Sequence, residues 1–328
     1  FCKMKTMKTI FILIAIALIS NGCKQSNSKS VNKSAVDFSQ MTFAEVKTAA
    51  DEGNPQAQNE IGNRFYFGIG ISKDSAEAVK WWQKSATQKF PPAELDLGLA
   101  YLKGDGVSKD EQEGIRLLRL GVDAGLPRAK EAMGMFYFLG AFGLPKDYTQ
   151  AFNWFKAAAQ DNYPPAQYYL AECFRDGKGT QTNLVEAIIW FEQAASNNMP
   201  NAEVILGNYY FSKGFSELGI TNHLTQSQLA NANFAMGAEW LRKAANQNYL
   251  PAQMFLVFAY RDGAGVPKDS VEAYKWFVLS SMKYPSETWK TNGVGFTAEE
   301  ISAGRLQAEE FSKTNHLKPK SVDQILGL

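Results

Sequence analysis

The sequence predicts an all-α fold, a right-handed α/α solenoid of six helix-pair repeats with a capping helix at each end. The first observation is an alanine that recurs at intervals of 36, 36, 37, 36 and 50 residues. The second is an apolar residue four positions after each alanine and an aromatic residue eight positions after it, which places all three on one helical face. Together they indicate stacked units that share a continuous core. The six alanines are Ala57, Ala93, Ala129, Ala166, Ala202 and Ala252.

A proline opens the first helix of each unit, and a glycine follows its aromatic residue. Proline is tolerated in the first turn because the backbone N–H groups there have no intrahelical partner. Glycine adopts the positive φ that ends many helices. The prolines are Pro55, Pro92, Pro127, Pro165, Pro200 and Pro251, and the glycines are Gly68, Gly104, Gly140, Gly177, Gly214 and Gly263.

An Asp or Asn opens the second helix of most units, and a Glu or Gln follows three residues later. This spacing lets the first side chain cap the backbone N–H groups of the first turn. Further along, a tryptophan or leucine marks the packing face, and we expect Trp154 and Trp190 to be buried between repeats. The cap pairs are Asp74/Glu77, Asp110/Glu113, Asp147/Gln150, Asn183/Glu186 and Asp269/Glu272.

The fifth unit is longer than the others, and its extra residues lie near 215–235. Thr225 and Gln228 have the spacing of a helix cap, so we expect the second helix of this unit to begin early and to project beyond its neighbours. Insertions in repeat arrays map to loops on one face, which is often the binding face. The alternative is a surface elaboration without a function.

The N-terminal region has the features of an export signal. Lys5 and Lys8 precede a short apolar run over 10–19, too short to span a bilayer about 30 Å thick. Gly22 and Cys23 follow, and this ending is similar to a bacterial lipoprotein signal, in which Cys23 would be lipidated and become the mature N-terminus. Simple cleavage and an uncleaved anchor are the alternatives.

The chain is therefore expected to contain five segments and one continuous core. The tether is assigned on its Ser, Asn and Lys content, and each capping helix on a Thr followed three residues later by Glu. The segments are a signal peptide at 1–23, a flexible tether at 24–41, an N-terminal capping helix at 42–54, six repeats at 55–284, and a C-terminal capping helix with a tail at 285–328.

Charge and composition argue against several functional classes. A net charge of +1 offers no basic field for nucleic acid. His223 and His316 lack a second ligand at metal-binding spacing, so no metal or cofactor is expected. The recurring acids are helix caps, so no catalytic residue is assigned. Cys173 stands alone in the repeats and is expected to be buried and unpaired.

The pattern resembles the Sel1-like repeat family, a relative of the tetratricopeptide repeat. The matching string is Ala-x3-Leu-Gly-x2-Tyr-x2-Gly-x-Gly-Val-x2-Asp-x3-Ala-x2-Trp-aromatic-x-Lys-Ala-Ala, and the unit from Ala252 to Ser281 carries most of it. The resemblance covers roughly residues 42–312 and implies a scaffold that binds proteins. Some secreted proteins of this type carry a disulfide in each repeat and are linked to β-lactam binding, but this chain lacks paired cysteines.

By analogy with tetratricopeptide repeats, the positions two, six and nine residues after each repeat alanine face the concave side. In this chain they are mostly apolar with a few charges, as expected of a protein-binding groove. The alternative is that tight curvature packs the same side chains against the next repeat. The candidate binding residues are Tyr168, Glu172, Arg175, Asn208, Phe211, Phe258 and Arg261.

These features predict an exported, lipid-anchored protein-binding scaffold of the cell envelope, facing the periplasm, and not an enzyme. The resemblance implies a more specific role, because some Sel1-repeat lipoproteins are immunity proteins that neutralise type VI secretion effectors such as lipases. A secreted effector is therefore a candidate partner, besides the membrane that holds the anchor. The alternative is a β-lactam- or peptidoglycan-interacting enzyme of the Sel1-repeat type.

Overall fold

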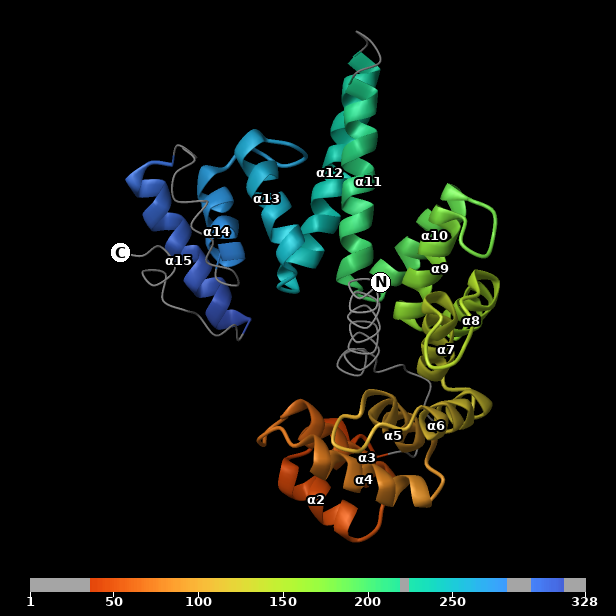
Figure 1. Ribbon diagram of the computed structural model, residues 1–328. Helices are drawn as coiled ribbons and strands as arrows, with labels where there is room; N and C mark the ends of the chain where they lie inside the picture. The colour runs from red at the N-terminus through yellow and green to blue at the C-terminus, as the bar shows by residue number, and fades with distance from the viewer. Residues whose placement is uncertain (1–35, 219–223, 282–295, 316–328) are drawn as a thin grey trace, which may run out of the picture. The chain divides into compact units, whose positions relative to one another are not determined.

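The computed structural model describes residues 36–218, 224–281 and 296–315, and these residues form helices joined by short turns, with no strand among them (Figure 1). They divide after Ala187 into two compact units, each described here by itself. The sequence had suggested one continuous core.

Unit 1 contains the N-terminal capping helix and the first repeats, built as consecutive antiparallel pairs. A short 3-10 helix, η2, precedes them, and α10 begins in this unit and ends in the next. The elements are η2 (Phe38–Gln40), α2 (Phe43–Asp51), α3 (Pro55–Phe67), α4 (Ser75–Thr87), α5 (Pro91–Lys103), α6 (Glu111–Asp123), α7 (Pro127–Leu139), α8 (Tyr148–Gln160), α9 (Pro164–Asp176) and α10 (Leu184–Ser196).

Unit 2 contains the two last repeats and the C-terminal capping helix. Its core includes Leu241, Leu256 and Trp276, and α15 covers the end of the array by packing Phe311 against Trp276 at a ring separation of 5.5 Å. The elements are α11 (Pro200–Leu218), α12 (Leu224–Asn246), α13 (Leu250–Asp262), α14 (Ser270–Ser281) and α15 (Ala298–Thr314).

The predicted helix caps are present. In each of the five cap pairs, the side chain of the Asp or Asn accepts a hydrogen bond from the backbone N–H three residues later, as Asp74 does from Glu77 at 2.9 Å. The reciprocal bond of a full capping box forms at Thr42 and Thr297, which open the two terminal capping helices α2 and α15. Left-handed glycines such as Gly68 and Gly104 end the first helices.

In the third and fourth repeats the core contains the residue after the tryptophan, whereas Trp81 and Trp276 of the first and sixth repeats are themselves buried. Phe155 and Phe191 are buried, whereas Trp154 and Trp190 are half-buried, so the expectation of buried Trp154 and Trp190 was wrong by one position. Phe155 fits against Gly134, where a Cβ atom would lie 2.6 Å from its ring. A glycine five residues after the repeat alanine thus makes room for this side chain.

The folded part of the chain begins before the first capping helix. Phe38 is buried, and the Arg64 guanidinium donates hydrogen bonds to the carbonyls of Phe38 and Met41 at 2.9 and 2.7 Å. Arg64 is itself buried and also pairs with Glu60 at 2.9 Å. Residues 36–41, expected to belong to the tether, are therefore fixed to the first repeat.

The insertion of the fifth unit is helical. Both α11 and α12 are lengthened, to 19 and 23 residues against 12 or 13 in the other repeat helices, and the pair extends beyond α13 and α14 (Figure 1). Only the lengthening of the second helix had been predicted. The first helix continues through Gly214, which does not end it.

Candidate protein-binding surfaces

In the first repeats, two of the positions predicted to line a groove, Asn59 and Glu131, belong to a nearly buried polar row. Asn59 on α3 donates to Asp96 on α5 at 3.2 Å, and Arg128 on α7 donates to the other oxygen of Asp96 at 2.6 Å. Glu131, also on α7, has its pKa raised to about 8 by burial, which the nearby Arg128 opposes. Packing within the array, rather than a solvent-filled groove, dominates at these positions.

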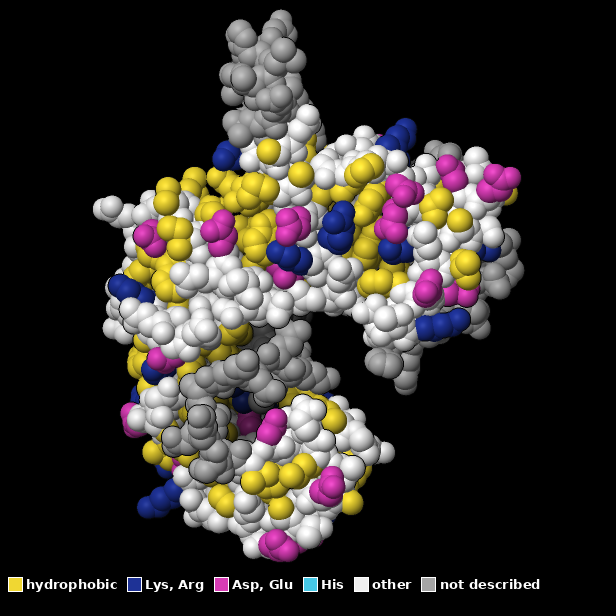
Figure 2. Space-filling view, turned by 180° about the vertical axis from the view of Figure 1, so that it is seen from behind, with side chains coloured by type: hydrophobic (Ala, Val, Ile, Leu, Met, Phe, Trp, Pro, Cys, Tyr) yellow, Lys and Arg dark blue, Asp and Glu magenta, His cyan; other side chains and the backbone are white. Residues whose placement is uncertain are grey.

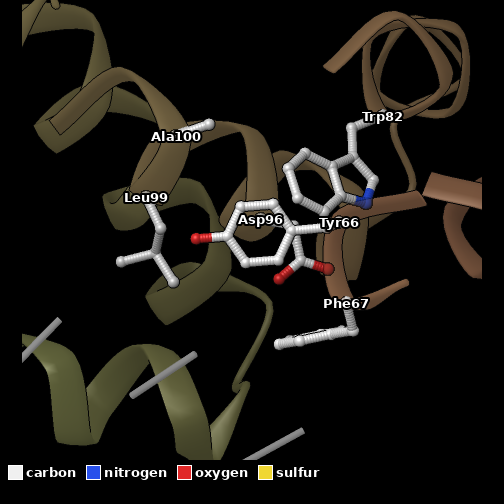
Figure 3. Close-up of a pocket in the computed structure, with 6 residues that line it drawn as sticks. All are labelled: Tyr66, Phe67, Trp82, Asp96, Leu99 and Ala100. Carbon is white, nitrogen blue, oxygen red and sulfur yellow. The ribbon is translucent and has the colours of Figure 1, made fainter. Parts of the chain in front are cut away.

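A small hollow opens beside this row (Figure 3). Tyr66 and Phe67 of α3 and Trp82 of α4 form its aromatic side, and the Tyr66 ring lies in front of the Asp96 carboxylate. The hollow contains about 260 Å³ of space between atoms, part of it open solvent. Lys103 donates to the Tyr66 hydroxyl at 3.0 Å. The Tyr66 hydroxyl at this hollow is therefore already hydrogen-bonded within the protein, which favours a structural role for the hollow.

The hollow is completed by Leu99 and Ala100 of α5. Burial raises the pKa of Asp96, and Arg128 opposes this shift. Burial also lowers the pKa of Lys103.

The three candidate residues of α9 lie on one side of that helix and are half-buried. The Arg175 guanidinium pairs with Glu172 at 2.6 Å and with Asp176 at 2.8 Å. These pairs hold the pKa of Asp176 at about 2, whereas burial raises the pKa of Glu172. The Tyr168 ring contacts that of Tyr169. Arg175 is thus already neutralised within its own helix, and binding by these residues stays a prediction.

The two candidate residues of α11 have different surroundings. Asn208 is exposed. Phe211 packs against the buried Phe234 of α12, with ring centroids 5.6 Å apart and the ring planes tilted by 55°, and faces Gly237, so it contributes to the core of unit 2. A truncation of Phe211 would alter packing as well as any surface.

Three exposed apolar side chains lie on α13, and two of them, Met254 and Phe258, are at positions expected to face the concave side. Met254, Phe255 and Phe258 are 37%, 43% and 41% exposed. The Arg261 guanidinium lies 5.0 Å from the Phe258 ring centre and pairs with Asp262 at 2.7 Å. Met254, Phe258 and Arg261 are spaced four and three residues apart, so they share one side of the helix. We call Met254, Phe255, Phe258 and Arg261 the α13 face.

The sequence alone did not single out Phe255, although it extends the α13 face. Phe255 lies outside the i, i+4, i+8 stripe that forms the core of its helix. A large apolar residue at such a position could have been predicted to be exposed. Tyr209 on α11 and Met236 on α12 are similar exposed apolar residues, 39% and 43% exposed.

Charges of both signs alternate over the surface. On the side of the molecule in Figure 2, single Lys, Arg, Asp and Glu side chains are interspersed with apolar ones, without a field of one sign. Among the described residues, no three His, Cys, Asp or Glu side chains are grouped so as to hold a metal ion. The same residues include no helix long and apolar enough to cross a membrane.

Several predicted features fall outside the described residues. These are the lipidation candidate Cys23, both histidines, and the side chains of 215–230. Cys173 is described, and it is buried and unpaired, as expected. Burial raises the pKa of its thiol to about 12.

Comparison with known proteins identifies the repeats. The Sel1 repeat model matches residues 55–90, 91–126, 127–163, 164–199, 200–249 and 251–283. No curated protein matches the chain. Among solved structures, a Sel1 repeat protein from Oxalobacter formigenes is 27% identical, with a TM-score of 0.58, covering 72% of this chain and 98% of its own.

Two more distant structures have TM-scores below 0.5. A protective antigen of uropathogenic Escherichia coli is 19% identical, with a TM-score of 0.37 and coverage of 95% of this chain and 93% of its own. An immunity protein from Pseudomonas aeruginosa is 18% identical, with a TM-score of 0.43 and coverage of 73% and 82%. The six matched repeats, which span most of the sequence and coincide with the helix pairs, show that this chain belongs to the Sel1 repeat family.

Proposed function

We propose that this chain is an exported, lipid-anchored scaffold that binds a protein partner through the α13 face. The observation that carries the proposal is the exposure of three large apolar side chains beside an arginine on one helix of a repeat scaffold. Aromatic side chains, Met and Arg are enriched in protein interfaces relative to the rest of the surface. The polar row of the first repeats is packed internally and offers fewer free groups.

Anchoring is proposed on the sequence of the N-terminal region, and the fold of the first repeat is compatible with it. A lipid on Cys23 would be joined to the solenoid by residues 24–35, because the chain is fixed to the first repeat from about Val36 onward, where Gln56 donates to its carbonyl at 2.8 Å. A flexible segment of that length spans about 20 Å. The scaffold would thus stand close to the membrane surface with its repeats free to bind.

The role proposed for the scaffold is neutralisation of a secreted effector, as the family resemblance suggests, without catalysis. Inhibition by a binding scaffold needs shape and apolar contact rather than a reactive group. The exposed α13 face supplies both. The enzymatic alternative, a β-lactam- or peptidoglycan-interacting protein, would require a nucleophile beside a base. The hydroxyl–carboxylate pairs of Ser39 with Asp37 and of Thr42 with Glu45 are exposed and belong to helix caps.

Binding is tested by capture of effectors from the same organism on immobilised full-length chain. Phe258→Ala combined with Arg261→Glu should weaken capture at least tenfold while the melting temperature stays within about 2 °C. Leu306→Ala is the matched control, since Leu306 is an exposed apolar residue on α15, outside the α13 face. Equal loss in both variants, or unchanged capture by the double variant, would refute the assignment of the surface.

Anchoring and protection are tested separately. Cys23→Ser should move the protein from the membrane fraction to the soluble fraction, and mass spectrometry of the wild-type chain should show acyl groups on Cys23. Co-expression should protect cells from the captured effector, and the Phe258→Ala, Arg261→Glu variant should not. A wild-type chain without acyl groups contradicts anchoring while leaving the binding surface untouched.

A further inference from the structure

A buried glutamine recurs directly after the repeat alanine and binds the end of the preceding helix. Gln58, Gln167 and Gln253 occupy this position, and each is at most 6% exposed. The Gln58 amide donates to the Ala50 carbonyl at 3.1 Å, and the Gln253 amide donates to the Ala245 carbonyl at 3.4 Å. At these positions the glutamine supplies a donor to a helix end, whose last carbonyls have no intrahelical partner, whereas the second and third repeats have Glu94 and Lys130 there.

A second acceptor lies beside these carbonyls. In the fourth and sixth repeats the turn after the preceding helix contains an asparagine with positive φ, and its side-chain oxygen accepts from the glutamine. Gln167 donates to Asn162 at 2.9 Å, and Gln253 donates to Asn248 at 3.1 Å. The glutamine amide thus joins the preceding helix end to the turn that follows it.

The fifth repeat has Glu203 at this position, and it is 1% exposed. The backbone around it matches that of the sixth repeat. Asn198 has a φ of 58°, against 59° for Asn248, and the N–H of Asn198 donates to Ala195 at 3.0 Å. The acceptors that a glutamine meets in other repeats, a helix-end carbonyl and an asparagine, therefore recur in front of a carboxyl group.

A carboxylate has only acceptors, so in its ionised form Glu203 cannot replace the glutamine. A protonated carboxyl group has one O–H to donate. We propose that Glu203 holds a proton in the folded protein and uses it as the donor to the end of α10, which makes the junction of α10, α11 and α12 a pH-responsive element.

The groups that face Glu203 are compatible with this assignment. From α12, the Gln247 amide donates to one carboxyl oxygen at 2.8 Å, which leaves the other oxygen for the proton. Lys243 of α12 is the charged group that acts on Glu203, and its ammonium pairs with Glu239 at 3.2 Å. Burial raises the pKa of Glu203 to about 7, and Lys243 and Gln247 only partly oppose that shift.

The direction of the pH effect follows from this shift. Glu203 ionises in the unfolded chain near its ordinary pKa of 4.5 and in the folded protein near 7. The stabilisation from the proton is complete below about pH 4.5 and is lost as the pH rises toward 7. Above that pH the start of α11 and the end of α12, where Glu203 and Gln247 meet, should open more readily.

The test compares the full wild-type chain with Glu203→Gln between pH 5 and pH 8.5. Glutamine is the residue that other repeats use, so this variant is expected to fold. It should melt close to the wild type at pH 5 and several degrees higher at pH 8.5. In hydrogen exchange at pH 8.5, amides of 200–206 and 244–249 should exchange at least tenfold more slowly in the variant. Equal melting differences at both pH values would overturn the proposal.

A reciprocal substitution and a direct titration complete the test. Gln253→Glu should create the same pH dependence in the sixth repeat, with a larger loss of melting temperature at pH 8.5 than at pH 5. Carbon-13 carboxyl resonances of labelled Glu should show one group that titrates near pH 7 and disappears in Glu203→Gln. A Glu203 resonance that titrates below pH 5 would refute the assignment.

Discussion

Gly265, in the turn after α13, lies directly against the backbone carbonyl of Phe234, well inside α12. The equivalent glycines of unit 1, Gly106 and Gly179, lie against the carbonyls of Ser75 and Tyr148, the first residues of α4 and α8. Phe234 therefore occupies the position at which the second helix begins in the repeats of unit 1. The part of α12 before Phe234 is the added segment, and the contact between consecutive repeats is kept despite it.

We predict that Gly265→Ala destabilises unit 2 more than Gly263→Ala does. Both glycines have positive φ, near 73–74°, so alanine at either costs about 1–2 kcal/mol of backbone strain. At Gly263 the nearest atom to a new Cβ is at 3.5 Å, an ordinary contact, whereas at Gly265 the Cβ would overlap Phe234. Urea unfolding of both variants measures the difference, and equal losses would contradict this account of the repeat contact.

Much of this fold could be predicted from the sequence because the same residue pattern recurs in each repeat. Helix starts, caps and glycine stops depend on residues close in sequence, such as Asp74 and Glu77, so spacing alone predicts them. The lengthening of α11 past Gly214 did not follow, because a glycine ends a helix only where the chain then turns. The burial of Phe155 in place of Trp154 depended on the facing Gly134, a contact between helices.

The candidate site was predictable only in part, since exposure is a property of the assembled helices. The repeat spacing placed both Phe211 and Phe258 at positions expected to face the concave side. In the structure the first packs against Phe234 and the second is exposed. Phe234 packs on Phe211 as Tyr148 packs on Phe138 in the third repeat, and the spacing within one helix does not indicate such a contact between helices.

We predict that Phe155→Ala destabilises unit 1 by about 3–5 kcal/mol, the range for truncation of a buried aromatic side chain. Phe155 is 1% exposed and stacks on Tyr169 with ring centroids 5.2 Å apart. Trp154→Ala is the matched control and should cost clearly less, because Trp154 is half-buried. Denaturant unfolding measures both, and a larger loss for Trp154→Ala would restore the original packing assignment.

Arg64→Met should release residues 36–41 from the first repeat. The substitution removes charged hydrogen bonds to the carbonyls of Phe38 and Met41, and we expect a loss of about 2–3 kcal/mol. Limited proteolysis should then cut within 36–42 at least tenfold faster. Lys47→Met removes a partly exposed pair with Asp51 and should leave the cleavage rate unchanged. Protection that persists in Arg64→Met would show that Phe38 packing alone fixes the segment.

Cys173 should resist thiol reagents in the folded protein. Its side chain is 1% exposed, and its thiol is protonated at neutral pH because burial raises its pKa to about 12; the thiolate is the reactive form. A chromogenic disulfide reagent should label Cys173 only after denaturant is added, as shown by mass spectrometry of the peptide. Rapid labelling at pH 7 without denaturant would show that α9 opens readily.

Glu131→Gln should stabilise unit 1, and the gain should grow with pH. Glu131 is 2% exposed, and among the described residues no donor bonds its Oε2 atom. The nearby Arg128 forms its hydrogen bond with Asp96. Tyr169, which also interacts electrostatically with Glu131, carries no positive charge that could stabilise the carboxylate. The pKa of Glu131 is about 8 when folded, against 4.5 as its ordinary value, so the unfolded chain ionises first and stability falls between these pH values.

The melting temperature of Glu131→Gln relative to wild type should therefore rise from pH 5 to pH 9. Glu113→Gln is the control of opposite sign. The Glu113 carboxylate accepts two hydrogen bonds of 2.7 Å from Arg116, which lower its pKa. Wild type should exceed that variant slightly above about pH 4.5, with no further change up to pH 9. A flat difference for Glu131→Gln across this range would mean that Glu131 gains a donor in solution, and its burial would then carry no pH dependence.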